Sequence, residues 1–145
     1  MRVVAVSLVL GLAPTAAADI AGAWTFETNI RTKGCSINGN MSIGIADAAG
    51  KRDCVFTSTE TCEWDLPGDE GTTVDQSCRV IEQGDYYLIT SKVERSLTAG
   101  YDAAYYLPDH FTVKPVAADR MAGQWYDRNY RDKVTFWRNR EAPIS

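Results

Sequence analysis

Apolar and polar side chains alternate with a period of two residues along most of the chain. In the first such stretch Trp24, Phe26 and Ile30 share one face, and polar residues occupy most positions between them. This is the period of a half-buried β-strand, whose successive side chains point to opposite faces. No stretch beyond the first eighteen residues has the 3.6-residue apolar period of a long helix. The pattern therefore predicts an all-β protein.

Turn-forming residues divide the chain into eight such stretches. They cover residues 20–31, 35–45, 53–63, 77–82, 86–97, 104–114, 121–126 and 134–138. Eight consecutive strands with short connections favour an antiparallel up-and-down barrel, because closure pairs every strand edge. A two-sheet β-sandwich is the alternative that the pattern leaves open. The polar stretch 67–73 is expected to form an exposed loop.

Residues 1–18 have the three parts of a secretory signal peptide: a basic start, an apolar run over residues 3–12, and alanines at Ala16 and Ala18 for cleavage. The apolar run is shorter than the roughly 20 residues that span a bilayer, so we expect no stable membrane insertion. Cleavage leaves residues 19–145 as a single disulfide-bonded β-barrel domain. The short basic start and the alanine-rich site indicate a bacterial protein that is periplasmic or secreted.

Four cysteines in an exported chain predict two disulfides. Antiparallel pairing about a turn at residues 47–51 sets Cys35 opposite Cys62, at a distance that suits a cross-strand bridge. Cys54 and Cys78 are then left for each other. The alternative joins Cys35 to Cys78 and Cys54 to Cys62. A metal site is not expected, because the spacing contains no Cys-x-x-Cys.

The net charge and the residue types present reduce the number of function classes that fit this sequence. The formal net charge is −4, and an acidic chain is a poor nucleic-acid binder because phosphate contacts need surplus cations. The sequence has one histidine, His110, and no Gly-x-Ser-x-Gly motif that would supply a nucleophilic serine for it. Cysteines that form disulfides cannot serve as nucleophiles. We therefore expect no enzyme and no cofactor. A hydrolase that uses His110 is the remaining catalytic alternative.

The triplet Gly22-Ala23-Trp24 resembles the first strand of the calycins, the superfamily of lipocalins and avidin-like proteins, which carries Gly-x-Trp. In lipocalins this tryptophan closes the barrel floor and stacks under an arginine from the end of the last strand. Arg138 or Arg140 stands at the corresponding place in this chain. The resemblance implies a lipocalin-like barrel in which Trp24 and Arg138 have a structural role in closure.

The C-terminal part is rich in aromatic and cationic residues. We expect a hairpin here with a charged seven-residue loop, 127–133, whose Arg128, Tyr130 and Arg131 are the candidates for binding a ligand or partner. The alternative is that residues 127–133 form a solvated loop with internal ion pairs and no binding role.

A turn centred near Tyr130 places Gly123 opposite Trp137 and Trp125 opposite Thr135. In that register the two tryptophans share one face of the hairpin. Arg138 then points to the other face, where Trp24 could meet it.

These observations favour a non-enzymatic binding protein that holds a small apolar or aromatic ligand or docks on a protein partner, for example as an inhibitor of an exported hydrolase. A structural or assembly factor of the cell envelope is the alternative. We expect a monomer. A cavity inside the barrel favours a small ligand, whereas a solid core with an exposed aromatic or arginine patch favours a protein partner.

Overall fold

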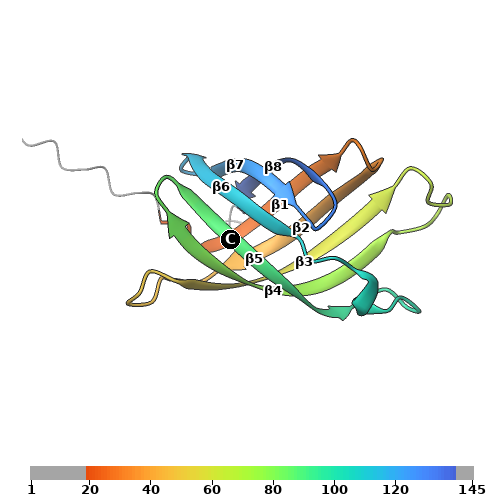
Figure 1. The fold of residues 1–145 in the computed structure, drawn as a ribbon, viewed down its shortest axis with the longest axis horizontal. Helices are drawn as coiled ribbons and strands as arrows, with labels where there is room; N and C mark the ends of the chain where they lie inside the picture. Colours follow the sequence, from red (N-terminus) through yellow and green to blue (C-terminus); the bar gives the residue numbers. More distant parts are fainter. Residues whose placement is uncertain (1–18, 140–145) are drawn as a thin grey trace, which may run out of the picture.

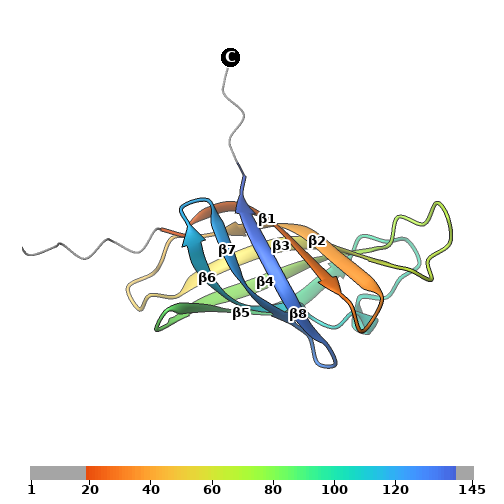
Figure 2. The same cartoon turned by 90° about the horizontal axis from the view of Figure 1, so that it is seen from above.

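Eight antiparallel strands follow one another in chain order around a closed barrel (Figure 1, Figure 2). The computed structural model describes residues 19–139, so the predicted signal peptide lies outside the described part. The strands are β1 (Gly22–Ile30), β2 (Cys35–Ile43), β3 (Arg52–Cys62), β4 (Thr72–Gln83), β5 (Tyr86–Ser96), β6 (His110–Ala117), β7 (Arg120–Tyr126) and β8 (Arg131–Arg138), with the 3₁₀ helix η1 (Ala103–Tyr105) before β6. Pairing of β1 with β8 closes the barrel. This confirms the predicted barrel and excludes the sandwich.

The two ends of the barrel differ in their connections. The turns after β1, β3, β5 and β7 lie at one end, which we call the loop end because it carries the two long connections, 63–71 and 97–109. Figures 1 and 2 show these two loops at the right-hand end of the molecule. The other end, which we call the closed end, carries the turns after β2, β4 and β6. No helix in residues 19–139 has the length and apolar character needed to cross a membrane.

Four phenylalanine rings fill the middle of the barrel. Phe26, Phe56, Phe111 and Phe136 are buried, and their ring centroids lie 5.1 to 5.7 Å apart, which is contact distance for aromatic pairs. A Cβ atom at Gly39 would collide with the Phe26 ring, so this glycine gives the ring its space. No small molecule fits between rings at this separation. The middle of the interior is therefore packed core.

At the closed end the guanidinium of Arg138 lies 4.3 Å from the ring centroid of the buried Trp24. Arg138 also donates hydrogen bonds of 2.8 Å to the carbonyls of Asp19 and Ala21, while the indole N–H of Trp24 donates to the Ile20 carbonyl at 2.9 Å. The pair thus holds the segment that precedes β1 across the barrel floor. This is the arrangement that the calycin resemblance implies, and Arg140 lies outside the described residues.

The structure has the disulfides Cys35–Cys62 and Cys54–Cys78, and none of the four cysteines is free. Each pair is directly opposite in its strand ladder, Cys35 with Cys62 between β2 and β3 and Cys54 with Cys78 between β3 and β4. The hairpin register about residues 47–51 therefore leads to the preferred connectivity. Two disulfides indicate an oxidising, extracytoplasmic environment.

Peptide mapping can check this connectivity directly. Digestion of the unreduced protein is expected to release one peptide pair joined through Cys35 and Cys62 and a second joined through Cys54 and Cys78. Reduction before digestion should separate both pairs. A peptide that joins Cys35 to Cys78 in the unreduced digest contradicts the structure.

The predicted strand 104–114 is wrong in its first half. The chain forms η1 and then an extended segment, and β6 begins only at His110. Asp102 caps η1 by accepting a 2.9 Å hydrogen bond from the Ala104 N–H. Pro108 has no N–H to donate to a ladder, and the N–H of Asp109 donates to the side chain of Gln76 instead. The first half of the predicted strand is therefore part of the long β5–β6 loop.

The predicted register of the last hairpin is also wrong. Trp125 lies opposite Asp132, and Gly123 lies opposite Val134. The shift is an odd number of residues, which moves a side chain to the other face. Trp125 therefore points into the core, while Trp137 is exposed on the outer face.

The cause of this shift is a tight turn. The carboxylate of Asp127 accepts hydrogen bonds of 2.7 Å from the N–H groups of Asn129 and Tyr130, and the N–H of Asp127 donates to the Tyr130 carbonyl at 3.0 Å. The loop is thus four residues long, and β8 starts at Arg131 rather than at Val134.

Candidate functional site

The three residues predicted to bind a ligand or partner lie in the β7–β8 turn and at the start of β8. Arg128 and Arg131 are exposed, and neither takes part in an ion pair within residues 19–139. Tyr130 is half-buried, packs against the core, and has the ammonium of Lys33 5.4 Å from its ring centroid. The tyrosine therefore helps to cover the loop end, and both arginines are exposed beside it.

A buried carboxylate lies inside the barrel near the loop end. Asp109 is 1% exposed, and four neutral donors bind it. The Trp125 indole N–H donates to Oδ1 at 2.8 Å. The donors to Oδ2 are Gln76 Nε2 at 2.7 Å, Ser58 Oγ at 3.0 Å and the Tyr106 hydroxyl at 3.1 Å. We call these five residues the Asp109 cluster.

The Asp109 cluster connects the barrel wall to the long β5–β6 loop. Ser58 is on β3, Gln76 on β4 and Trp125 on β7, whereas Tyr106 and Asp109 belong to the loop segment before β6. A buried polar group is costly unless it is hydrogen-bonded, so these contacts favour one position of the segment over others. The cluster therefore anchors the loop.

Electrostatics agrees with an anchoring role. Burial raises the pKa of Asp109 to about 6, although the hydrogen bonds from Trp125 and Gln76 act in the opposite direction. Burial also raises the pKa of Tyr106, so its phenol stays neutral and can donate. When Asp109 is protonated, the hydroxyl of Ser58 or Tyr106 can rotate so that its oxygen accepts a hydrogen bond from the carboxylic acid. Both charge states of the carboxyl group can thus be hydrogen-bonded.

His110 lies outside this cluster. Its side chain is on the outer face, where Nδ1 accepts a 3.1 Å hydrogen bond from the backbone N–H of Ser91 and the ring lies 5.4 Å from that of Tyr126. Burial lowers the pKa of His110. The buried hydroxyl of Ser58 donates to Asp109 instead. Within residues 19–139, His110 bonds to Ser91 through the serine's backbone N–H, and no hydrogen bond joins it to a serine hydroxyl.

Two neighbouring loops expose apolar side chains at the loop end. Trp64 is 64% and Tyr105 79% exposed, and Leu66 and Leu97 are exposed as well. Trp64 and Leu66 belong to loop 63–71, and Leu97 and Tyr105 to loop 97–109. We call these four residues the apolar tips.

Backbone hydrogen bonds hold loop 63–71 in place. The Glu63 N–H donates to the Gly34 carbonyl at 2.9 Å, and the Asp65 carboxylate accepts from the Cys62 N–H at 2.8 Å. The disulfide between Cys62 and Cys35 ties the start of the loop to β2. Trp64 therefore stands on a constrained turn.

Loop 97–109 is constrained in a similar way. The Leu97 N–H donates to the Thr73 carbonyl, and the Thr73 N–H donates to the Thr98 hydroxyl, both at 2.8 Å. These bonds join the base of this loop to β4, directly after loop 63–71. Buried Tyr106 anchors the chain next to exposed Tyr105. The two loops are therefore linked to the same strand, and their apolar tips are presented to solvent.

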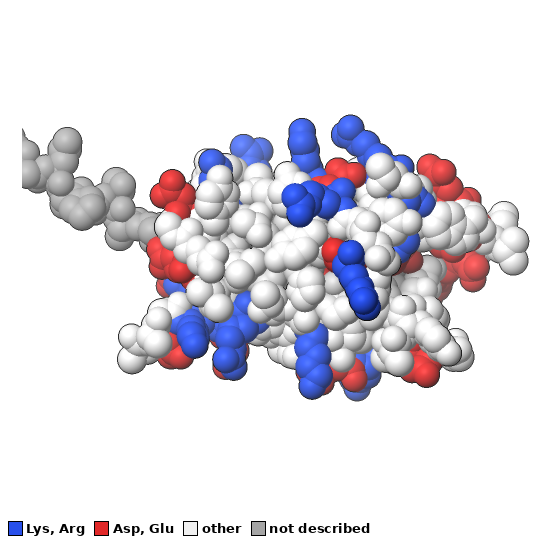
Figure 3. Space-filling view, in the orientation of Figure 1, with Lys and Arg blue, Asp and Glu red and all other residues white. Residues whose placement is uncertain are grey.

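The loop 63–71 is acidic. It carries Glu63, Asp65, Asp69 and Glu70 and no lysine or arginine. In Figure 3, red acidic atoms lie beside white, uncharged surface at the right-hand end of the molecule. The surface at this end combines exposed apolar groups with negative charge.

The sequence analysis missed the Asp109 cluster and did not single out the apolar tips. A signal for part of the cluster was present, because Gln76 stands between Val74 and Cys78 at an inward-facing position of the alternating pattern. A polar residue at such a position indicates a buried partner. No comparable sequence signal marks Asp109, whose partners lie up to 51 residues away.

Comparison with protein-family models and with curated protein sequences gives no match. Among solved structures, a de novo designed fluorescence-activating β-barrel matches with a TM-score of 0.60 and 13% identity, over 86% of this chain and 97% of that chain. The redesigned barrel mFAP1, bound to DFHBI, matches with a TM-score of 0.58 and 9% identity, over 82% of this chain and 94% of that chain.

The redesigned barrel mFAP0, also bound to DFHBI, matches with a TM-score of 0.59 and 12% identity, over 81% of this chain and 97% of that chain. At such low identity these likenesses are of fold alone. They define the class of the protein as a small eight-stranded up-and-down β-barrel.

Proposed function

We propose that this protein is a non-enzymatic binding barrel of the periplasm or the external medium, and that it docks a protein partner through the apolar tips. The observation that supports this proposal most is that the four apolar tips are exposed on two anchored loops. The middle of the barrel, in contrast, is filled by phenylalanine rings. A filled interior with exposed aromatic groups supports a protein partner over a small ligand inside the barrel.

The physical argument rests on burial and order. Aromatic side chains that enter a partner's pocket supply much of the binding energy of protein interfaces. Loops that are already ordered lose little conformational entropy on binding. The acidic residues of loop 63–71 favour a partner whose surface is cationic around an apolar pocket. Inhibition of an exported hydrolase is one role that such a docking surface can serve.

A small aromatic ligand is the second candidate. Two of the structures with the same fold are described as bound to DFHBI, so barrels of this size can hold a small molecule. In this protein the contacts among Phe26, Phe56, Phe111 and Phe136 disfavour a small molecule in the middle of the barrel.

A matched pair of double variants tests the docking surface. Leu66→Ala/Tyr105→Ala removes one aliphatic and one aromatic group at the loop end. Ile45→Ala/Tyr86→Ala removes a similar pair, also exposed, at the closed end. The partner is first captured from periplasmic extract with the wild-type protein, identified by mass spectrometry and purified. The loop-end variant is then expected to bind it at least about tenfold more weakly, because two contacts of more than 1 kcal/mol each are lost. The closed-end variant should bind it as the wild type does.

Equal affinity of both double variants for the purified partner contradicts docking through the apolar tips. Native mass spectrometry of the purified protein addresses the second candidate. A retained small molecule that leaves on denaturation supports a ligand inside the barrel instead.

A further inference from the structure

A row of outward-facing side chains runs obliquely around the outer face of the barrel, from Arg120 near the closed end to Arg95 near the loop end. Each member pairs laterally with the next across neighbouring strands. In spatial order the members are Arg120 on β7, Trp137 on β8, Thr25 on β1, Asn40 on β2, Thr57 on β3, Asp75 on β4 and Arg95 on β5. We call this the outer row. Adjacent strands are about 4.8 Å apart, so the row presents one polar or aromatic side chain about every 4.8 Å around the barrel.

Hydrogen bonds within the outer row fix the positions of its side chains. The Thr25 hydroxyl donates to Asn40 Oδ1 at 3.2 Å and also contacts Asn139 Oδ1. The Thr57 hydroxyl donates to Asp75 at 2.6 Å, and Arg95 Nε donates to the same carboxylate at 2.7 Å. The binding groups are therefore arranged before any ligand arrives, which lowers the entropy cost of binding.

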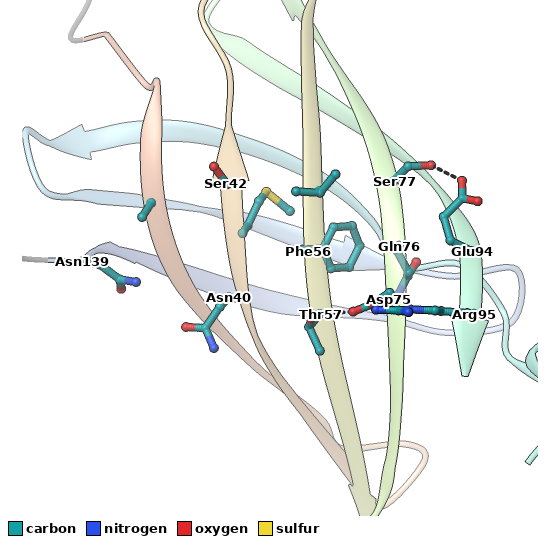
Figure 4. A pocket seen from close by; sticks show the side chains of 13 residues that line it. Asn40, Ser42, Phe56, Thr57, Asp75, Gln76, Ser77, Glu94, Arg95 and Asn139 are labelled. Carbon is teal, nitrogen blue, oxygen red and sulfur yellow. Dashed lines mark hydrogen bonds and ion pairs between the residues drawn. The ribbon is translucent and has the colours of Figure 1, made fainter. Parts of the chain in front are cut away.

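A groove of about 480 Å³ lies along the part of this row from Asn40 to Arg95, and Figure 4 shows it from close by. Asn40 and Asn139 lie on one side of the groove, and Asp75 and Arg95 on the other. The exposed side chain of Val55 contributes an apolar surface between them. An apolar surface flanked by a few ordered polar groups is typical of sites for small organic ligands.

A β-bulge places a second charge beside Arg95. The pairing of β4 with β5 shifts between Asp75 and Gln76, which leaves Glu94 as the extra residue between Val93 and Arg95. Bulges re-aim side chains in this way. Glu94 then accepts a 2.6 Å hydrogen bond from the Ser77 hydroxyl. The groove thus holds two carboxylates against one guanidinium, which disfavours an anionic ligand.

Several groups along the groove keep hydrogen-bonding capacity. In the described part of the chain, the side-chain amides of Asn40 and Asn139 are bonded through oxygen alone, and the guanidinium of Arg95 through Nε alone. One oxygen of Glu94 accepts from Ser77, and the other has no partner among residues 19–139. Among the described residues, the groove therefore offers free donors on both sides and a free acceptor at Glu94. A sugar hydroxyl both donates and accepts, so vicinal hydroxyls match this arrangement.

Trp137 does not line the groove, but it lies in the outer row beyond Thr25, whose other neighbour in the row is the groove residue Asn40. It offers a second kind of contact. Its ring is 43% exposed on the outer face and stands between Thr25 and Arg120 in the outer row. Exposed indole rings offer a flat apolar face with a polar edge. The apolar face of a pyranose can pack on such a ring while its hydroxyls reach the neighbouring polar groups.

We propose that the outer row, together with the adjoining groove residues Asn139 and Glu94, is a binding site for a neutral saccharide chain. Trp137 is the stacking platform, and Asn40, Asn139, Glu94 and Arg95 are the hydroxyl-binding groups. This site shares no residue with the apolar tips, although Arg95 lies two residues before Leu97, and neither proposal depends on the other.

The test is a titration with three soluble hexasaccharides: cellohexaose, chitin hexasaccharide and the acidic oligogalacturonate of the same length. Amide resonances of the ¹⁵N-labelled protein report where each one binds. Either neutral chain is expected to shift the resonances of Thr25, Asn40 and Thr57, and oligogalacturonate should bind more weakly. Trp137→Ala should lower the affinity at least about tenfold, since the stacking contact is lost.

The matched control is Trp64→Ala, which removes the other exposed tryptophan, at the loop end. This variant should bind the neutral chains as the wild type does. An unchanged thermal melting curve shows that Trp137→Ala is folded, and Asn40→Ala provides a second variant that keeps every tryptophan.

Three results overturn the proposal. The first is that no outer-row resonance shifts at about 10 mM of either neutral chain, a concentration that would reveal even millimolar affinity. The second is tighter binding of oligogalacturonate than of the neutral chains. The third is that Trp137→Ala converts a wild-type dimer to a monomer in sedimentation, which assigns the exposed ring to self-association.

Discussion

Replacing Trp24 by alanine is expected to lower the free energy of unfolding by about 3 to 5 kcal/mol. The tryptophan is fully buried at the closed end, where it packs under the guanidinium of Arg138 and donates to the Ile20 carbonyl. Its removal leaves a cavity and takes away the ring on which Arg138 lies. Urea unfolding followed by far-ultraviolet circular dichroism measures the loss.

Two further variants separate closure of the floor from other effects. Trp64→Ala removes an exposed tryptophan and should change the free energy of unfolding by less than about 1 kcal/mol. Arg138→Lys keeps the charge but loses the planar guanidinium that spans the Asp19 and Ala21 carbonyls, and should have an intermediate effect. If Trp24→Ala is no more destabilising than Trp64→Ala, Trp24 does not close the barrel.

The second large effect is a pH dependence of stability caused by Asp109. Burial raises the pKa of its carboxyl group in the folded protein to about 6, from an ordinary value of 3.8. Between these values the folded state binds a proton more tightly than the unfolded state does. The contribution of this group to stability is therefore fully present below pH 3.8 and is lost as the pH rises through about 6. A shift of this size corresponds to about 3 kcal/mol.

The measurement compares the wild type with Asp109→Asn by urea unfolding between about pH 3 and pH 7. Asparagine has nearly the same shape and does not titrate, so the difference between the two curves isolates the carboxyl group. We expect the stability of the wild type relative to Asp109→Asn to fall with rising pH over this range. A difference that rises with pH shows instead that the four hydrogen bonds to the carboxylate outweigh its burial.

Local features of the sequence account well for the strands and the disulfides. The alternation in β1 places Trp24, Phe26 and Ile30 on the buried face, as the structure has them. Pairing about residues 47–51 places Cys35 opposite Cys62. Both inferences use interactions within one strand or one hairpin, where the two-residue period and the turn together determine which side chains meet.

The same reasoning is wrong for the last hairpin, where one carboxylate changes the turn. Asp127 accepts from two backbone N–H groups and shortens the loop to four residues, which brings Trp125 into the core and leaves Trp137 outside. A turn signal in the sequence does not specify the loop length, and an odd shift exchanges the two faces.

The sequence alone determined the all-β class and the alternation within most strands, and it favoured the disulfide partners and the barrel that the structure has. Only the tertiary structure decided where polar chemistry gathers, because Asp109 meets Ser58, 51 residues away, inside the closed barrel, and Trp137 joins Asn40 and Arg95 in one row on its outside. Alternation and turns act between neighbours along the chain. The meeting of distant strands depends instead on closure of the whole sheet, whose register no single segment contains.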